Sequence, residues 1–380
     1  MTFYLVGPYY PLRGGIAQYL AILGKKLEEK GHRIKVLAFR KQFPRFLFPG
    51  QTQLETSSDY IKLESEALFI PWNPLSWWRT FRAVRRGQPA ALIFKYWMPF
   101  FAPGYAAVCA LTKLFTNTRT IYILDNVIPH ETRPGDKFLT RLALRWVDGF
   151  IVQSDTVKQD LLKWFPAAVR RGLREVPHPV YDCYAGSDLS CETARERLEL
   201  RADQKILLFF GLVRKYKGLD ILLEALPAMI SGLGGDVHLL VVGEFYEAEA
   251  MYRRKASELG IAERVSIINR YVPNEEVALY FRAADLLVLP YRSATQSGVV
   301  QIAYHFGLPV VSTRVGGLPE VIKEGRTGFL VEPDRPDQLS QAVLKFFREG
   351  RAEDFRKAGL EEAGKYSWGA MISAIEGLIS

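Results

Sequence analysis

Two cationic side chains follow a predicted buried strand in the second half of the chain. The strand KILLFF runs into Gly211, and the loop after it carries Arg214 and Lys217 directly before a helical stretch that begins at Gly218. Cations between a strand end and a helix N-terminus can bind a diphosphate and stabilise it as a leaving group. A solvated basic loop without a ligand is the alternative.

A polar loop precedes a second predicted helix in the same half. Its residues are Thr295, Gln296, Ser297 and Gly298. Hydroxyls, an amide and backbone N–H groups at a helix start suit a phosphate or the hydroxyls of a sugar. Helix capping by threonine or serine accounts for part of this pattern without a ligand.

A glycine pair opens a helix in the first half. The first predicted strand ends at Gly7, and Gly14 and Gly15 start the helix that follows. Glycines allow backbone amides to approach a phosphate or a sugar at the positive end of a helix. The spacing differs from the G-x-G-x-x-G of a dinucleotide site, which argues against a dehydrogenase. A structural helix start is an equal alternative.

A carboxylate and a histidine follow another first-half strand, in the run IYILDNVIPHETRPGD. Asp125 comes directly after the strand, and His130 comes five residues later. A carboxylate there can orient or deprotonate a hydroxyl, and an imidazole can donate to a sugar or a phosphate. A structural role for His130 in the turn at Pro129 is equally compatible, and Glu131 and Asp136 can simply cap the next helix.

The elements that carry these residues repeat along the chain. Short aliphatic or β-branched runs alternate with amphipathic stretches, which predicts parallel sheets covered by helices, the α/β class. We expect first-half strands at residues 3–6, 34–38, 91–94, 120–124 and 150–153. The second-half strands are expected at residues 205–210, 237–242, 265–268, 286–289 and 310–312.

The length of 380 residues exceeds one ordinary doubly wound domain and suits two. Two prolines and small polar residues interrupt the pattern at 176–186. We therefore expect one domain at residues 1–180 and a second at 181–353. The last segment, 354–380, is predicted to be a helix that packs back on the first domain, with Trp368 on its apolar face.

Composition excludes several classes of protein. Three cysteines without paired spacing offer neither a disulfide framework nor a zinc site. The N-terminus lacks the pattern of a signal peptide, and the longest apolar stretch, 98–111, contains two prolines and falls short of the roughly 20 residues of a membrane-spanning helix. We expect a cytoplasmic location. The net charge of +9 favours anionic partners, which include sugar nucleotides, lipid headgroups and nucleic acid.

The order of these motifs resembles that of the GT-B glycosyltransferases of family 4. The specific part is GLPVV followed by GGLPE and GRTGFLVEP, and the resemblance covers nearly the whole chain. It implies an α/β GT-B fold, in which two Rossmann-like, doubly wound domains face each other across a cleft. It also implies a retaining transferase that uses a nucleotide sugar and needs neither an obligatory metal nor another cofactor.

Several site residues are implied by position in the family's motifs. Gly14 and Gly15 match its glycine pair near the donor diphosphate and the acceptor, and Lys217 matches the lysine of its Lys-Gly loop. The VVGE run places Gly243 and Glu244 on the donor side, after Gly211. These are the residues at which we expect donor contacts.

Three positions depart from the family's pattern. Leu212 stands where an arginine usually follows the strand-ending glycine, and Arg214, two residues later, is expected to reach the phosphates. The family's paired glutamates, separated by seven residues, fall on Ala294 and Ile302. Their hydrogen bonds to the donor sugar and the ribose would have to come from Gln296, Gln301 or Glu320. Asp125 coincides with the family's strand-end histidine.

Two first-half segments, 39–50 and 72–88, are both basic and aromatic. Tryptophan and phenylalanine beside arginine suit a lipid-linked acceptor or a peripheral contact with an anionic membrane, at the inner face. The alternative, equally open, is that the aromatic residues belong to the core face of a helix and the arginines to its solvent face.

The sequence therefore predicts a retaining glycosyltransferase that moves a sugar from a nucleotide sugar to a hydroxyl of a glycan, a lipid-linked or a small-molecule acceptor. Asp125, His130, Arg214 and Lys217 are its candidate catalytic residues. A nucleotide-sugar binding protein without chemistry is one alternative, motivated by the missing glutamates, and a GT-B epimerase that acts on the donor alone is another. No nucleic-acid recognition motif accompanies the basic residues.

Overall fold

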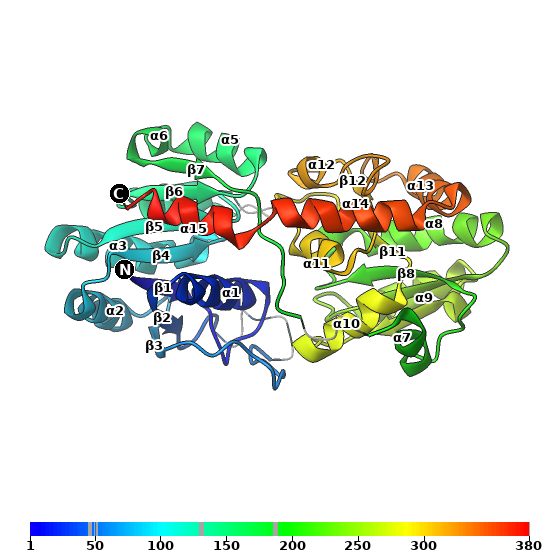
Figure 1. Cartoon of the computed structure of the whole chain (residues 1–380), viewed down its shortest axis with the longest axis horizontal. Helices are drawn as coiled ribbons and strands as arrows, with labels where there is room; N and C mark the ends of the chain where they lie inside the picture. Colours follow the sequence, from blue (N-terminus) through cyan, green and yellow to red (C-terminus); the bar gives the residue numbers. More distant parts are fainter. Residues whose placement is uncertain (45–47, 49, 51, 129–132, 185–188, 380) are drawn as a thin grey trace. The chain divides into compact units, whose positions relative to one another are not determined.

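The computed structural model describes the chain except residues 45–47, 49, 51, 129–132, 185–188 and 380 (Figure 1). It divides into two compact units. The first unit comprises Met1–Thr56, Tyr60–Pro179 and Ser367–Ser380. The second unit comprises Ser57–Asp59 and Val180–Tyr366.

Parallel strands form the sheet of the first unit, in the order β3-β2-β1-β4-β5-β6-β7. Their bounds are β1 Thr2–Gly7, β2 Arg33–Phe39, β3 Ser65–Phe69, β4 Ala91–Tyr96, β5 Arg119–Leu124, β6 Gly149–Val152 and β7 Leu173–Glu175. In the register of the centre, Phe3 of β1 pairs with Ile34 of β2 and Ala91 of β4. The strand order reverses between β1 and β4, and such a switch point is where open α/β sheets bind ligands, at the carboxyl ends of the strands.

Helices cover both faces of this sheet. They are α1 Gly15–Glu29, α2 Pro74–Gly87, η2 Pro99–Phe101, α3 Ala102–Phe115, α4 Asp136–Leu144, α5 Asp155–Trp164, α6 Ala168–Arg171 and α15 Trp368–Glu376. Successive residues of β4 point to opposite faces, so Phe94 contacts Tyr105 of α3 whereas Lys95 faces Tyr19 of α1. Trp368 joins α15 to α1 through the ring of Tyr19, with centroids 5.0 Å apart.

The second unit repeats the plan with parallel strands in the order β10-β9-β8-β11-β12-β13. The strands are β8 Lys205–Phe210, β9 Val237–Val242, β10 Val265–Ile268, β11 Leu286–Leu289, β12 Val310–Thr313 and β13 Gly328–Val331. Its strand order reverses between β8 and β11. The second unit therefore has a switch point of its own.

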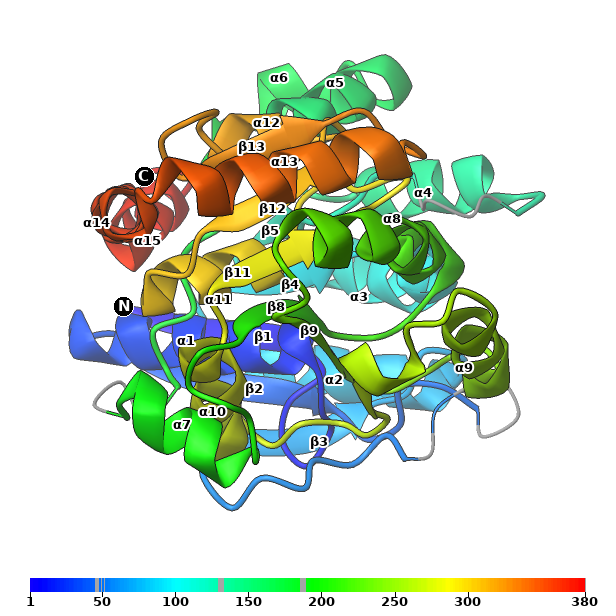
Figure 2. The same cartoon turned by 90° about the vertical axis from the view of Figure 1, so that its right-hand side faces the viewer.

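The helices of the second unit are α7 Cys191–Arg197, η3 Lys215–Lys217, α8 Leu219–Gly232, α9 Glu249–Glu258, η4 Ala262–Arg264, α10 Asn274–Ala283, α11 Gly298–Phe306, α12 Leu318–Val321, α13 Pro336–Glu349 and α14 Ala352–Lys365. α8 and α13 pack side by side over one face of the sheet (Figures 1 and 2). The two helices contribute to the core of the unit with Leu222, Met229, Val343 and Phe346. On the other face, Phe210 of β8 contacts Phe281 of α10.

The ten predicted strands are all present, and the described part of the chain contains three further strands that the prediction missed. β3, β7 and β13 are edge strands. The first three residues of β3 are exposed, β7 is only the three residues Leu173–Glu175, and β13 has four residues and begins at a glycine. An edge strand needs no continuous apolar run, so the sequence signal of β3 and β7 is weak.

The C-terminal segment differs from the prediction of one helix over 354–380. It forms two helices, which are separated at Tyr366 and Ser367. α14 belongs to the second unit, where it contacts α11, and only α15 belongs to the first. The prediction that this segment packs on the first domain is therefore wrong for α14. Trp368 is buried, 4% exposed, as its apolar position indicated.

Candidate functional site

Two glycines let the ends of β8 and β9 meet closely beside the switch point of the second unit. Gly211 follows β8 with φ +104°, and Gly243 follows β9 with φ +144°. A Cβ added to Gly243 would lie 2.0 Å from the carbonyl oxygen of Gly211. Only glycine fits this arrangement, which leaves bare backbone at the edge of the sheet.

The half-buried ammonium group of Lys217 lies over this glycine turn. Its Nζ would be 3.1 Å from a Cβ placed on Gly211, and it lies 5.2 Å from the ring centroid of Tyr291, beyond the end of β11. Burial lowers the pKa of Lys217, an effect that Tyr216 opposes and that the positive charge of Arg214 reinforces. Lys217 thus stands between the ends of β8 and β11, where the strand order reverses.

Arg214 supplies a second cation in the same loop. Its guanidinium lies 4.7 Å from the ring centroid of Tyr246, in the loop after β9. Within the described ranges, neither Arg214 nor Lys217 forms an ion pair. Two cations without a protein counter-charge, directly before the N-terminus of α8, favour an anionic ligand such as a diphosphate.

Arg292, a residue that the sequence analysis missed, fastens this loop. Its guanidinium binds both carboxylate oxygens of Asp220, at 2.9 and 2.7 Å, and its Nε lies 2.7 Å from Oδ1 of Asp334. It also donates to the carbonyl oxygen of Lys215 at 2.8 Å. The two carboxylates raise the pKa of Arg292, with Asp220 the larger cause. A bidentate pair of this kind fixes the loop that carries Arg214 and Lys217.

The TQSG loop lies against the other side of this switch point. α11 begins at Gly298, and the hydroxyl of its N-cap, Ser297, makes no capping hydrogen bond, so capping does not account for that residue. The backbone N–H of Gly317 donates to the carbonyl oxygen of Thr295 at 3.0 Å. Val299, in the first turn of α11, comes within 3.6 Å of a Cβ placed on Gly211. The start of α11 therefore adjoins the glycine turn of β8.

The positions of the family's two glutamates are apolar and buried here. Ala294 and Ile302 are each 6% exposed. Gln301, beside Ile302, is 1% exposed, and its Oε1 has no hydrogen-bond partner in the part of the chain that the structure describes. Glu320 is exposed on α12, and Glu244 is buried, with a carbonyl oxygen that accepts from the N–H of Val213 at 2.9 Å. Gln301 therefore combines burial with a side-chain oxygen that no described residue satisfies.

The glycine pair of the first unit lies at its own switch point. Gly14 is the N-cap of α1 and has φ +109°, a conformation that favours glycine. No atom lies within 4 Å of a Cβ placed there, so the space over the helix start is open. The first turn of α1, which begins at Gly15, contains no acidic residue.

A buried charged network occupies the carboxyl ends of β4, β5 and β6. The ammonium group of Lys95, with no exposed surface, lies 2.6 Å from Oδ1 of Asp125 and donates to Oε1 of Gln153 at 2.6 Å. It also lies 3.5 Å from the ring centroid of Tyr19. Gln153 in turn donates to the Tyr19 hydroxyl at 3.1 Å. Asp125 is therefore held at the edge predicted for it, by a lysine that the sequence analysis did not single out.

Of the remaining first-half candidates, the structure describes only Asp136. His130 and Glu131 lie outside the described residues. Asp136 begins α4, and its carboxylate accepts from the N–H of Arg133 at 2.7 Å. This hydrogen bond closes the turn before α4 and is not a helix cap, so of the roles expected for Asp136 only its place as an acidic residue in the first turn of the helix is observed.

The two aromatic and basic segments differ in exposure. Phe39 is buried, 1% exposed, and Phe43 packs on Phe101 with ring centroids 5.8 Å apart, so these residues of the first segment belong to the core. On α2, Phe81 is buried, whereas Trp78 is 47% exposed. The core alternative thus holds for Phe39, Phe43 and Phe81, and the outer face of α2 is both apolar and basic.

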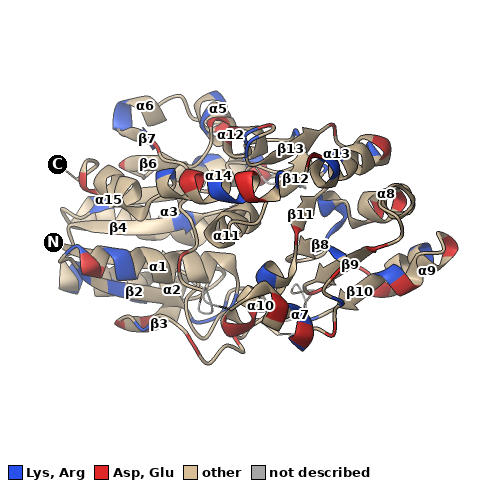
Figure 3. Ribbon diagram, turned by 45° about the vertical axis from the view of Figure 1, so that its right-hand side comes forward, with Lys and Arg blue, Asp and Glu red and all other residues tan. Residues whose placement is uncertain are grey.

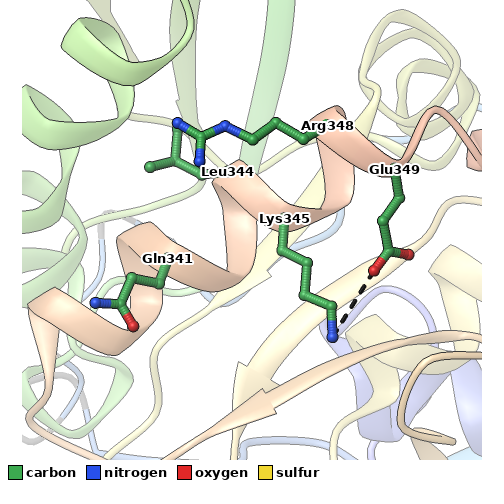
Figure 4. A pocket seen from close by; sticks show the side chains of 5 residues that line it. All are labelled: Gln341, Leu344, Lys345, Arg348 and Glu349. Atoms are coloured by element: carbon green, nitrogen blue, oxygen red, sulfur yellow. Dashed lines mark ion pairs between the residues drawn. The ribbon is translucent and has the colours of Figure 1, made fainter.

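Other surface features offer no comparable site. Among the described residues, no three side chains of His, Cys, Asp or Glu gather to hold a metal ion. A pocket on the outside of α13 is lined by residues of that helix alone, with Lys345 and Glu349 paired at 3.7 Å (Figure 4). Helices such as α9 and α14 carry charges of both signs (Figure 3). No described helix has the length and hydropathy that would let it span a bilayer.

Solved structures with the same fold are glycosyltransferases. Sucrose-phosphate synthase from Thermosynechococcus elongatus superposes with a TM-score of 0.74 at 18% identity, over 100% of this chain and 98% of the other. The Anabaena protein HepE, solved in complex with UDP-glucose, gives a TM-score of 0.72 at 16% identity over 99% of both chains. The fold is therefore that of the GT-B glycosyltransferases, as the motifs implied.

Two sequence families cover most of the chain. Residues 13–180 match Glycosyltransferase Family 4, and residues 204–349 match Glycosyl transferases group 1. Each half of the chain thus matches a glycosyltransferase family, and the first half matches family 4. Among curated relatives, D-inositol 3-phosphate glycosyltransferase of Corynebacterium glutamicum is 28% identical over 237 residues, which are 61% of this chain and 56% of the relative. The corresponding protein of Thermobifida fusca is 29% identical over 67% of this chain and 58% of its own. The chain spans about half the length of the curated relatives it matches.

Proposed function

We propose that this chain transfers a sugar from a nucleotide-sugar donor to a hydroxyl group, with retention of the anomeric configuration. The observation that carries the proposal is the pair of cations without counter-charge, Arg214 and Lys217, beside the glycine turn at the switch point of the second unit. The family matches of both halves support it, and so does the likeness to HepE, a protein solved in complex with UDP-glucose.

The proposed chemistry is mainly electrostatic. Arg214, Lys217 and the N-terminus of α8 offset the negative charge that develops on the departing diphosphate. The same cations take the place of a metal ion, so we propose that neither a metal nor another cofactor is required. The donor phosphate can accept the proton of the attacking hydroxyl, so no strong protein base is needed.

Product analysis with a panel of donors tests this proposal. We expect the protein to release the nucleoside diphosphate from one of UDP-glucose, GDP-mannose, ADP-glucose or dTDP-glucose, and to do so faster when an acceptor is added. The names of the relatives make an inositol phosphate the first acceptor to try, followed by glycans and lipid-linked sugars. The rate should be the same with and without EDTA.

Two results would favour a different function. Binding of a nucleotide sugar without any product would support a protein that keeps the ligand and has lost the chemistry, as the apolar Ala294 and Ile302 suggest. A new sugar nucleotide formed from donor alone would support an epimerase. Absence of both binding and product with every donor would contradict the proposal.

We further propose that the first unit contacts anionic membranes through the outer faces of α2 and α3. This α2–α3 surface consists of the exposed apolar residues Trp72, Leu75, Trp78, Leu114 and Phe115, and of the exposed arginines Arg79, Arg82, Arg85 and Arg86. Trp78 and Phe115 both contact Phe81, so the apolar part is continuous between the helices. Aromatic and basic side chains on one surface suit an anionic leaflet.

Flotation with vesicles tests this second proposal. The protein should float with vesicles that contain phosphatidylglycerol at low salt, and less with neutral vesicles. Arg82→Glu with Arg86→Glu should abolish flotation. Arg254→Glu with Arg348→Glu changes the charge equally on α9 and α13 and should leave it intact. Equal flotation of both double variants would contradict a docking role for α2.

A further inference from the structure

Lys95 is a charged residue at a fully buried position of β4. Lys95 is the fifth residue of β4, and its ammonium group has no exposed surface. A buried ammonium ion is costly unless it is paired and hydrogen-bonded. Here it binds Asp125 and Gln153, both at 2.6 Å, and lies against the face of the Tyr19 ring. An apolar residue would fill the same space in the sheet without these requirements.

The partners of Lys95 share one location. Asp125 directly follows β5, and Gln153 directly follows β6, so both stand at the carboxyl edge of the sheet where α/β proteins bind ligands. The N–H of Asp125 also donates to the carbonyl oxygen of Tyr96, which extends the pairing of β4 and β5. One ammonium group therefore fixes the side chains that follow two neighbouring strands.

The charges around this ammonium group favour an ionised carboxylate. Among the described residues, the titratable groups that face it are Asp125 after β5, Tyr19 of α1 and His178 in the segment after β7. Burial, together with the charge of Lys95, lowers the pKa of His178 to about 3, so this imidazole is neutral at physiological pH. Lys95 is then the cation that stabilises the negative charge of Asp125.

We propose that Lys95 is a positioning residue that holds Asp125 ionised and fixed, as a hydrogen-bond acceptor for a neutral hydroxyl group of the substrate. An ionised carboxylate accepts hydrogen bonds and donates none. It suits a sugar or acceptor hydroxyl at this edge, and it repels a phosphate. This proposal rests on the transferase activity proposed above, and it names the class of group that the first unit recognises.

Two measurements on the same variants test this role. The variants are Lys95→Met, Asp125→Asn and the double variant. In the nuclear magnetic resonance spectrum of protein with labelled aspartate carboxyl carbons, the Asp125 signal is identified by its loss in Asp125→Asn. Its titration midpoint should lie at least one pH unit higher in Lys95→Met than in the parent, which requires no enzyme activity. An unchanged midpoint would overturn the proposal.

Kinetics supply the second readout. Lys95→Met should lower kcat at least tenfold at a pH one unit below the Asp125 midpoint of that variant, with little change in the donor KM, and the loss should diminish as the pH is raised through that midpoint. The double variant should be no slower than Asp125→Asn, because Lys95 acts through Asp125. A double variant that is slower still, or a loss that is equal at every pH, would overturn the positioning role.

Controls separate this inference from simpler explanations. Lys113→Met removes another ion pair of the first unit, with Asp148, which binds the N–H of Thr120 at the opposite end of β5. It should leave both readouts unchanged. If Lys95→Met does not fold, Lys95→Arg keeps the positive charge, and its titration midpoint should match the parent; a midpoint that rises would contradict the proposal. A parent protein without transferase activity refutes the proposed function, while the titration still decides the role of Lys95.

Discussion

Arg292 and Asp220 are joined by two parallel hydrogen bonds of 2.9 and 2.7 Å, across 72 residues of sequence. The pair links the segment after β11 to the first turn of α8. Since the same guanidinium holds the carbonyl oxygen of Lys215, it also sets the conformation of the loop that carries the two unpaired cations. A residue whose guanidinium is paired with protein groups thereby fixes the loop on which Arg214 and Lys217 stand.

We predict that Arg292→Lys weakens binding of the nucleoside diphosphate about tenfold, equivalent to ~1.4 kcal/mol. Lysine keeps the charge but cannot bind both oxygens of Asp220, so the loop loses part of its fixation. Isothermal titration with the diphosphate measures the effect. Arg335→Lys, which alters an exposed pair with Asp337, is the control, and equal affinities for the two variants would refute the role of Arg292.

Lys217→Ala should lower kcat/KM for transfer by roughly 10²- to 10³-fold, the range for removal of one group that stabilises a developing negative charge. The fold should be unaffected, because Lys217 has no carboxylate partner among the described residues. Steady-state kinetics and a melting curve check both parts. Lys215→Ala, two residues earlier and exposed, should retain parental activity. Full activity in Lys217→Ala would remove this residue from the leaving-group site.

Gly243→Ala should destabilise the second unit by at least ~2 kcal/mol, because φ of +144° is a strained conformation for alanine and its Cβ would meet the Gly211 carbonyl oxygen at 2.0 Å. Gly364→Ala is the matched control. It lies in α14 with no atom within 4 Å of the added Cβ, so a gain of about 0.5–1 kcal/mol is expected. Urea unfolding measures both, and equal effects would contradict the close approach of the strand ends.

The pKa of His178 makes the stability of the first unit depend on pH. Burial and the charge of Lys95 depress this pKa from 6.5 to about 3, so between these values the unfolded protein binds the additional proton. Stability at this site is therefore complete above pH 6.5 and decreases as the pH falls toward 3, by up to ~1.4 kcal/mol per pH unit. His178→Gln should show a shallower loss between pH 7 and 5 in urea unfolding. Identical slopes for parent and variant would contradict a neutral, buried imidazole.

Local patterns were sufficient to predict the central strands and the glycine turns of both sheets. Gly14, Gly211 and Gly243 all adopt positive φ, and each stands where a strand was expected to turn toward a helix. The side chains that fasten the site were not predictable in this way. Lys95 is a single polar residue within the apolar strand ALIFKY, and its importance depends on Asp125 and Gln153, which are 30 and 58 residues later.

Dependence on distant partners also explains why the role of Arg292 and the division of the C-terminal segment into two helices were not predicted. The partners of Arg292 come from α8 and from the loop before α13, and no pattern in a short window connects them. Amphipathic periodicity continues across Tyr366 and Ser367, so it predicted one helix where the chain makes two. These features depend on contacts between segments that are far apart in the sequence. Local patterns in a single sequence do not show which distant segments meet.

Because α15 is part of the first unit, the order in which the chain is translated affects when that unit can finish folding. The first unit needs this helix to cover Tyr19, and His32 binds the Glu376 carboxylate at 2.9 Å. Domains generally fold as they emerge from the ribosome, the N-terminal one first. Here α15 completes a unit whose other elements precede the second unit in the chain, so it is translated only after the whole second unit has been made. The ring of Tyr19 therefore stays without its contact to Trp368 until α15 has been translated, and by then the second unit has had time to fold.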